Sequence, residues 1–466
     1  MIAWLPELLY HDGRFESGVA LVCAEAGKIL KVARVDELTD EKRVSLPRRA
    51  MLPGMVNAHS HAFQRVLRGR AEFRTANQTD SFWTWRELMY SAATRLMPDD
   101  VYDASRMAFL EMALSGVTAV GEFHYLHHAP EGNTYDDPNL LAKEVIRAAG
   151  DVGLRIALLK VAYARSGFQT GPNPRQARFT EATPDVFLKN LSALAGSVSS
   201  ETAWIGVAPH SVRALPLDYL KEVIAYANQN ALKIHMHVAE QPAEVSACIE
   251  EHGRTPFALL ESEGLLSDRF TAVHAIHVTP KAVRSFAATG ALGCACPTTE
   301  RNLGDGVVPA GEYVDSGVPI CLGSDSHIQI DLFEDARELE YHLRLQKLAR
   351  VVLSVRTSPA AEHSPRVDDL AALLFECATI NGARSVGAPG GMLSSGKPAD
   401  FFTVDLDDPS IAGAAPENLL AAIVFSSTRA AVREVVVGGK PIVSEGRHVS
   451  QQDVIERFND LQKRLW

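Results

Sequence analysis

The stretch RAMLPGMVNAHSH, residues 49–61, guides the interpretation of the whole chain. It is an apolar run that ends in two histidines, His59 and His61, with one residue between them. Side chains two positions apart on a strand point to the same face, so both imidazoles can reach one ion. An HxH pair alone is weak evidence, because most such pairs lie on protein surfaces. Its place at the end of an apolar run makes it a candidate pair of metal ligands.

Seven further apolar runs follow, with helical patterns between them. They are TAVGEFHY (118–125), RIALLKVAY (155–163), TAWIGVAPHS (202–211), ALKIHMHVAE (231–240), FTAVHAIHV (270–278), ALGCACPTT (291–299) and VPICLGSDS (318–326). Strands that alternate with helices are typical of βαβ units with a parallel sheet. Eight such units predict an α/β protein with a closed (β/α)8, TIM-like barrel, whose active site lies where the strands end.

Both ends of the chain carry short strand patterns with turn signals instead. Near the C-terminus, AAVREVVVGGKPIVSEGRHV places a Gly-Gly pair between two β-branched runs, which is typical of a hairpin. We expect residues 1–50 and 395–449 to form a small β-sandwich domain. Residues 51–394 would form the barrel, and residues 450–466 a C-terminal helix.

Composition limits the functional classes. The chain has 466 residues, 46% of them hydrophobic, which is enough for one large barrel with a small second domain. The net charge of −11 is spread along the chain, which argues against nucleic acid or an anionic membrane as a partner. The six cysteines form no CxxC pair, and MIAWLPELLYHDGRFE has no basic leader, so we expect a reduced, cytoplasmic protein.

Two other runs end in residues able to bind a metal ion. The fifth ends in His237 and Glu240, and the eighth contains Asp325. With His59 and His61, these residues offer three imidazoles and a carboxylate. Such a set suits one divalent ion, with zinc favoured and iron(II) possible, and leaves room for water. Each residue alone could be a buried polar group at the barrel mouth, but the placement of all of them at strand ends favours a metal site.

In this order NAHSHAFQR, HVAE, VHA and GSDSH resemble the amidohydrolase superfamily over essentially the whole chain. The resemblance implies that His59, His61, His237 and Asp325 are metal ligands. It also implies that Asp325 acts as the catalytic base, His274 as a catalytic histidine and Glu240 as a proton shuttle. Family habit further suggests a homodimer.

Many members of that superfamily bind two metals through a carboxylated lysine at the end of the fourth strand. Here the fourth run ends in Ala208-Pro209-His210, and Lys160 lies in the third run instead. We therefore expect one metal, with Lys160 as a structural charge or a charge that lines the mouth.

The expected chemistry follows from these residues. A bound divalent ion would activate water, Asp325 would take the water's proton with help from His274, and Glu240 would protonate the leaving nitrogen. In the superfamily, HxxE at the fifth strand accompanies deamination.

A narrower resemblance is to the formimidoylglutamate deiminases, which hydrolyse N-formimino-L-glutamate to N-formyl-L-glutamate and ammonia in histidine degradation. It is carried by HAFQR (61–65), SFWTWRELMY (81–90), EFHY (122–125), HSVR (210–213) and NLGDG (302–306). The planar guanidinium group of arginine, which can form two parallel hydrogen bonds to a carboxylate, suits such a dicarboxylate substrate. The resemblance implies that the substrate contacts are Arg86, Arg213, Tyr125 and His210, and that Gln64 holds the formimino nitrogen together with Glu240.

Three alternatives remain open. The same metal machinery serves deaminases of cyclic substrates such as aminopurines, pyrimidines or triazines, and a barrel can also be a non-catalytic scaffold. Arg86 and Arg213 could be ordinary surface arginines. Several other residues have structural interpretations. Phe82, Trp83 and Trp85 would pack a loop over the mouth, although one of them could line the pocket. Cys294 and Cys296 would be buried small hydrophobes, His235 a core polar residue, and His277 and His327 would lie close to the assigned residues. We expect His124, His127 and His128 to lie in a loop near the mouth.

Overall fold

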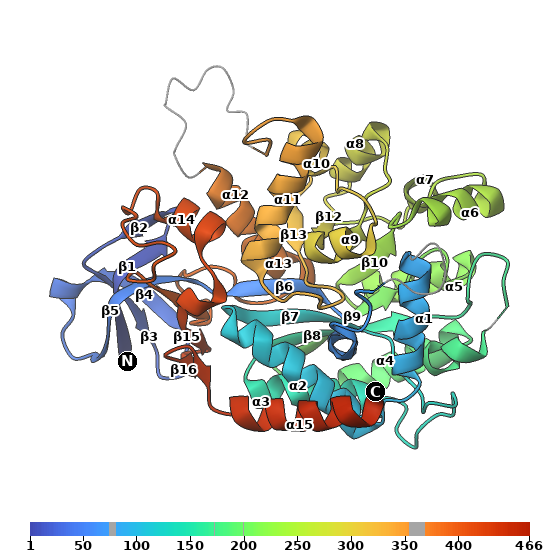
Figure 1. Ribbon diagram of the computed structural model, residues 1–466, viewed down its shortest axis with the longest axis horizontal. Helices are drawn as coiled ribbons and strands as arrows, with labels where there is room; N and C mark the ends of the chain where they lie inside the picture. Colours follow the sequence, from blue (N-terminus) through green and yellow to red (C-terminus); the bar gives the residue numbers. More distant parts are fainter. Residues whose placement is uncertain (74–80, 172, 199, 354–368) are drawn as a thin grey trace.

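The computed structural model describes residues 1–73, 81–171, 173–198, 200–353 and 369–466 of the chain. Eight parallel strands form one sheet in chain order, and nine strands from the two ends of the chain form a second sheet. In Figure 1 the second sheet lies at the left, beside the eight-stranded sheet and its helices. The α/β barrel and the β-domain built from both termini, which the sequence predicts, are both present.

The barrel strands are β6 (Met55–Ser60), β7 (Val117–His124), β8 (Arg155–Ala162), β9 (Ala203–Pro209), β10 (Ile234–Val238), β11 (Phe270–His274), β12 (Leu292–Ala295) and β13 (Ile320–Leu322). Closure occurs between the first and the last of these strands. A parallel bridge joins Ser60 to Asp325, the Asp325 amide donates to the His59 carbonyl at 3.0 Å, and the His61 amide donates to the Asp325 carbonyl at 3.1 Å. The seam that closes the barrel therefore runs through three of the predicted ligands.

Helices follow the barrel strands in the sequence. They are α1 (Phe82–Ala93), α2 (Pro98–Leu114), α3 (Leu140–Val152), α4 (Pro184–Ser197), α5 (Leu217–Gln229), α6 (Pro242–His252), α7 (Pro256–Ser262), α8 (Pro280–Ala288), α9 (Pro297–Leu303), α10 (Ala310–Ser316), α11 (Leu332–Lys347), α12 (Asp369–Ala378) and α13 (Ile380–Val386). Six of them begin with proline, whose fixed φ suits the first helical turn and whose missing N–H is not needed there.

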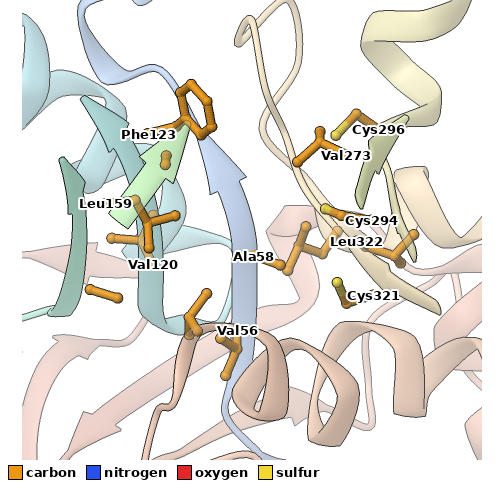
Figure 2. Close-up of a cluster of buried hydrophobic side chains, with 14 of the residues drawn as sticks. Val56, Ala58, Val120, Phe123, Leu159, Val273, Cys294, Cys296, Cys321 and Leu322 are labelled. Carbon is orange, nitrogen blue, oxygen red and sulfur yellow. The ribbon is translucent and has the colours of Figure 1, made fainter. Parts of the chain in front are cut away.

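The interior of the barrel is packed with side chains. Figure 2 shows Val56 and Ala58 of β6 between two groups of apolar residues, one from β7 and β8 and the other from β11, β12 and β13. Cys294, Cys296 and Cys321 belong to the second group and are fully buried. All six cysteines are free and buried, so the interpretation of Cys294 and Cys296 as small buried hydrophobes is confirmed.

The second sheet contains β1 (Ile2–His11), β2 (Arg14–Glu16), β3 (Val19–Cys23), β4 (Ile29–Arg34), β5 (Lys42–Pro53), β14 (Phe401–Asp405), β15 (Val432–Val437), β16 (Lys440–Ser444) and β17 (Arg447–His448). β5 joins the two halves, because it pairs with β1 in parallel and with β14 antiparallel. The predicted Gly-Gly hairpin is present between β15 and β16, where Gly438 and Gly439 both have positive φ. Such angles match the turn that the right-handed twist of a hairpin favours.

The run at residues 49–61, interpreted as one strand, is two strands in different sheets. β5 ends at Pro53 and β6 begins at Met55, with Gly54 between them. A Cβ on Gly54 would lie 2.3 Å from Oγ1 of Thr118, so only glycine allows the chain to pass this closely. The elements of the terminal sheet span residues 2–53 and 401–448. The domain boundaries stay a prediction.

The remaining helices are α14 (Leu419–Ser426) and α15 (Gln451–Leu465), with short 3-10 helices η1 (Val35–Glu37), η2 (Ala62–Leu67), η3 (Pro174–Phe179) and η4 (Arg429–Ala431). α15 runs along α2 at the lower edge of Figure 1. Its apolar residues recur at helical spacing and are buried, and ion pairs join Asp453 to Arg106 at 2.9 Å and Arg457 to Asp103 at 2.9 Å. Among the described residues, no helix has the length and apolarity needed to cross a membrane.

Candidate functional site

The carboxyl ends of the barrel strands bring the predicted metal ligands together. The ligand atoms of His59, His61, His237 and Asp325 all lie within 4.8 Å of one another, and all four residues are buried. Nε2 of His59 lies 3.2 Å from Nε2 of His61 and 3.2 Å from Nε2 of His237. Oδ1 of Asp325 lies 3.4 Å from Nε2 of His59 and 3.2 Å from Nε2 of His61. The sequence prediction placed the same four residues in one site.

Hydrogen bonds to the backbone orient two of the three imidazoles. Nδ1 of His61 lies 2.9 Å from the carbonyl oxygen of Phe123, and Nδ1 of His237 lies 3.1 Å from that of His210. A carbonyl oxygen can only accept, so the proton of each ring is on Nδ1. Nε2 of each ring then presents a lone pair toward the other ligands, which is the arrangement that metal-binding histidines require.

This donor set fits a divalent cation. Three ring nitrogens and a carboxylate oxygen converge at separations where acceptors would repel one another. Burial lowers the pKa of His59 to about 3 and holds the pKa of His237 well below its usual value, so protonation does not relieve the repulsion. A cation among the four atoms does relieve it. Three nitrogens and one oxygen are also a usual ligand set for zinc.

Beside the ligands lie two residues that can move protons. Nε2 of His274 lies 3.8 Å from Oδ2 of Asp325 and 3.8 Å from Oε1 of Glu240. The two oxygens of Asp325 therefore face different partners, one toward the histidine ligands and the other toward His274. Burial raises the pKa of the Glu240 carboxyl above its usual value, although the neighbouring His274 opposes the rise. A carboxyl with a raised pKa is suited to donating a proton near neutral pH.

A pocket of about 540 Å³ opens directly onto these groups. Its wall contains every predicted catalytic and substrate-contacting residue: Asp325, His274, Glu240, Gln64, Arg86, Tyr125, His210 and Arg213. His59 lies beneath the wall and is fully buried. The barrel thus brings together side chains from six strand ends and from α1.

Two arginines in this pocket have buried nitrogens without hydrogen-bond partners among the described residues. Nε and Nη1 of Arg86 and Nη1 of Arg213 are buried, and none has a hydrogen-bond partner. Neither guanidinium forms an ion pair with any residue that the structure describes. Burial and the nearby charge of Arg213 lower the pKa of Arg86 below its usual value. Two half-buried guanidiniums with unpaired nitrogens are suited to bind an anion.

The aromatic string 81–90 contains Phe82, Trp83 and Trp85, which were expected to pack a loop over the mouth, with one of them able to line the pocket. Phe82 and Trp85 do line the pocket, but the string is not a loop. It forms helix α1, because Ser81 accepts from Trp83 N while Thr84 accepts from Ser81 N, a reciprocal cap that starts the helix. The helical spacing turns Phe82, Trp85 and Arg86 toward the pocket. The Arg86 guanidinium stacks over the Trp83 ring at 4.4 Å, which fixes its plane.

Gln64 and Tyr125 form one polar unit on the pocket wall. Nε2 of Gln64 donates to the Tyr125 hydroxyl at 2.7 Å, and Oε1 of Gln64 is buried without a hydrogen-bond donor. That oxygen is available to a ligand N–H group. His210 follows β9 directly, and its ring lies 4.9 Å from the ring of His237. Gln64 and His210 thus lie beside the ligand cluster.

Several other residues have structural surroundings. Nε2 of His235 lies 3.0 Å from Oγ of Ser385 in the core, as expected for a core polar residue. Lys160 is buried in an ion pair of 3.0 Å with Glu181, away from the ligand cluster. Of the three histidines expected in a loop near the mouth, His124 is instead the last residue of β7. His127 and His128 follow β7, and all three are buried, with Nε2 of His127 2.8 Å from the Val161 carbonyl oxygen.

Sequence reasoning placed His327 close to the assigned residues but missed the polar network that it forms with Ser60 and Glu122 behind the ligands. Oγ of Ser60 lies 2.5 Å from Glu122 and 3.0 Å from His327, while the amide of Ala62 donates to Glu122 at 2.8 Å. It also missed Glu300, whose Oε1 lies 3.2 Å from Nδ1 of His274. No sequence spacing links Glu300 to His274, since they belong to different βα units.

Comparison with known proteins agrees with this geometry. Residues 50–442 match the amidohydrolase family. The chain is 37% identical over 98% of its length to formimidoylglutamate deiminase from Pseudomonas aeruginosa, covering 96% of that protein. It is 26% identical over 94% of its length to a 5-methylthioadenosine/S-adenosylhomocysteine deaminase from Haloarcula marismortui, covering 91% of it. An amidohydrolase structure from Brucella melitensis superposes with a TM-score of 0.87 at 33% identity, with both chains fully covered. This chain therefore belongs to the amidohydrolase family.

Proposed function

We propose that this protein is a formimidoylglutamate deiminase, a hydrolase that converts N-formimino-L-glutamate and water to N-formyl-L-glutamate and ammonia, in histidine degradation. The observation that carries the proposal is the pair Arg86 and Arg213, two half-buried guanidiniums in the pocket that holds the metal-binding cluster, whose buried nitrogens have no hydrogen-bond partner among the described residues. A dicarboxylate supplies the missing anions. The similarity to the deiminase from Pseudomonas aeruginosa supports the same substrate.

Asp325, His274 and Glu240 carry out the proton transfers of this reaction. When bound, a divalent ion activates water and polarises the C=N group. Oδ2 of Asp325 accepts the proton of the attacking water, with His274 beside it. Glu240 delivers a proton to the departing nitrogen, which leaves as ammonia. Oε1 of Gln64 accepts from the formimino N–H, while Tyr125 and His210 contact the substrate from the pocket wall.

The substrate assignment is tested by ammonia release from purified protein. We expect N-formimino-L-glutamate to be turned over with a kcat/KM of about 10⁴ M⁻¹s⁻¹ or more, a usual value for a natural substrate. Adenosine, S-adenosylhomocysteine, guanine and cytosine should react at least about 100-fold more slowly, because a heterocycle leaves both arginines unpaired. Absence of turnover with formiminoglutamate, or preference for a heterocycle, would reject the proposal in favour of a cyclic deaminase.

We propose one metal ion per chain, with zinc favoured over iron. β9 ends at Pro209 and carries no lysine at that end, and the buried Lys160 is already paired with Glu181. Elemental analysis of protein purified without chelators should find about one equivalent of divalent metal. At a free metal concentration of about 100 times the Kd, the bound ion stabilises the fold by about 2.7 kcal/mol. Removing the ion with a chelator should lower the free energy of unfolding by that amount. Two equivalents would contradict the single site, and none would favour a non-catalytic scaffold.

The enzyme is further proposed to be a cytoplasmic homodimer. Six free cysteines suit a reducing compartment. The proposed dimer rests only on the resemblance to the family. Analytical ultracentrifugation of the purified protein, which measures its molecular mass in solution, tests it.

A further inference from the structure

Glu300 lies directly behind the proposed proton-transfer histidine. It sits in the first turn of α9, after β12, and is 1% exposed. Its Oε1 accepts from the Cys296 amide at 2.9 Å and lies 3.2 Å from Nδ1 of His274. One carboxylate oxygen therefore connects the end of β12 to the end of β11.

These contacts determine which nitrogen of His274 carries the proton. Oε1 of Glu300 already accepts a backbone N–H, so it is the accepting oxygen of the carboxyl group. Nδ1 of His274 must then be the donor in the 3.2 Å contact. Whenever the ring is neutral, its lone pair is on Nε2, the nitrogen that faces Asp325 and Glu240 at 3.8 Å each. A proton can thus be accepted or released on the pocket side only.

The backbone around His274 is held in an unfavourable conformation. His274 and Ala275 have φ of +65° and +48°, in the left-handed region that non-glycine residues rarely adopt. Such strain persists only where surrounding contacts enforce it. The Tyr313 hydroxyl donates to the Ala275 carbonyl at 2.6 Å, and the His274 ring is held by Glu300. The structure thus fixes both the backbone and the ring at this position.

We propose that Glu300 is the positioning residue of the reaction: it holds His274 in the Nδ1–H tautomer and aims Nε2 between Asp325 and Glu240. The inference rests on the proposed function, in which His274 takes part in proton transfer. Outer carboxylates that orient a histidine typically change activity by about 10–100-fold when they are removed.

The same residues also form a geometric cluster of His274, Cys296 and Glu300 that could be interpreted as a second metal site. One contact and one pKa shift argue against it. Nδ1 of His274 carries a proton in its bond to Glu300 and has no lone pair to offer. Burial raises the pKa of the Cys296 thiol well above its usual value, which disfavours the thiolate form that binds metals. We therefore expect no metal to be lost with Glu300.

The decisive variant is Glu300→Gln, which keeps an oxygen for the Cys296 amide but removes the charge that favours Nδ1–H. We expect kcat to fall about 10–100-fold, with KM within about 3-fold and metal content unchanged. Glu300→Asp keeps the charge but withdraws it by one methylene, and it should lower kcat by a similar factor. Wild-type kcat in either folded variant, or loss of one metal equivalent, would overturn the proposal.

Asp335→Asn is the matched control. Asp335 is a buried carboxylate whose Oδ1 accepts from the Thr298 amide at 3.1 Å and its hydroxyl at 2.8 Å, so it supports the same helix, α9, without touching His274. Its kcat should stay within about 3-fold of wild type. An equal loss in Asp335→Asn and Glu300→Gln would mean that both carboxylates merely stabilise α9, and the positioning role would be rejected.

A double-mutant cycle separates this inference from the function on which it rests. In His274→Asn there is no imidazole ring for Glu300 to position. The kcat of the double variant should therefore lie within about 3-fold of the kcat of His274→Asn alone. Additive losses in the double variant would reject the positioning role while leaving the proposed function intact. Wild-type activity in His274→Asn alone would instead reject the role of His274 in the proposed function.

Discussion

Asp325→Asn is expected to lower kcat for formiminoglutamate by about 10³-fold or more, within the range of general acid–base catalysis. The asparagine amide cannot take a proton from water, and it is a poorer partner for the three histidines. Asp325 has a φ of +44°, and asparagine is among the residues that best tolerate this left-handed conformation. The bridge to Ser60 that closes the barrel is therefore expected to persist.

Loss of metal must be separated from loss of the base in this experiment. The variant is assayed after saturation with zinc, with bound metal measured in parallel and secondary structure compared by circular dichroism. Asp335→Asn again controls for loss of a buried carboxylate at this end of the barrel. Turnover within about 10-fold of wild type in metal-loaded Asp325→Asn would contradict the role of this residue as base.

Arg213→Met should weaken binding of the dicarboxylate by about 1.5–3 kcal/mol, the contribution of hydrogen bonds to a charged group. This is an increase in KM of roughly 10–150-fold, since 1.4 kcal/mol corresponds to a factor of ten. Methionine fills much of the space of the arginine stem, and no direct ion pair is broken among the described residues, although Glu244 and Glu240 lose a nearby positive charge. Stability should therefore change little.

Arg175→Met is the matched control for this substitution. Arg175 pairs with Glu87 on α1, near the mouth, but its side chain is 62% exposed and it does not line the pocket. Exposed pairs of this kind contribute little to stability or orientation, so KM should stay within about 2-fold. If kcat and KM are unchanged in Arg213→Met, the substrate carboxylates bind elsewhere and the dicarboxylate assignment loses its main support.

The alternation of apolar runs and helical patterns predicted the barrel from the sequence. Patterns of this kind are local: a strand end, a proline at a helix start or a Gly-Gly turn depends on neighbouring residues. The ligands could be predicted for the same reason, because parallel strands in one barrel present their carboxyl ends on one face. His59, His237 and Asp325 needed only to be placed at strand ends to be expected near one another.

Other features depended on contacts between distant segments. The run at residues 49–61 has no internal signal that it divides between two sheets, because the reason is the approach of Thr118 to Gly54. The aromatic string of α1 is rich in residues that suit either a loop or a helix, and the reciprocal cap between Ser81 and Thr84 decides it. Intrinsic helix propensity is a weak predictor of secondary structure where such tertiary and capping contacts dominate.

By itself the sequence determined the fold class, the terminal β-domain and a coherent set of metal ligands, because these follow from periodicity and strand order. Only the tertiary structure decided that buried nitrogens of Arg86 and Arg213 lack hydrogen-bond partners within the described part of the chain, and that Glu300 contacts His274. An arginine is an anion site only if no carboxylate of the chain reaches it, and a buried carboxylate positions a ring only if two βα units place them in contact. Both conditions are set by packing across the barrel, which no local pattern encodes.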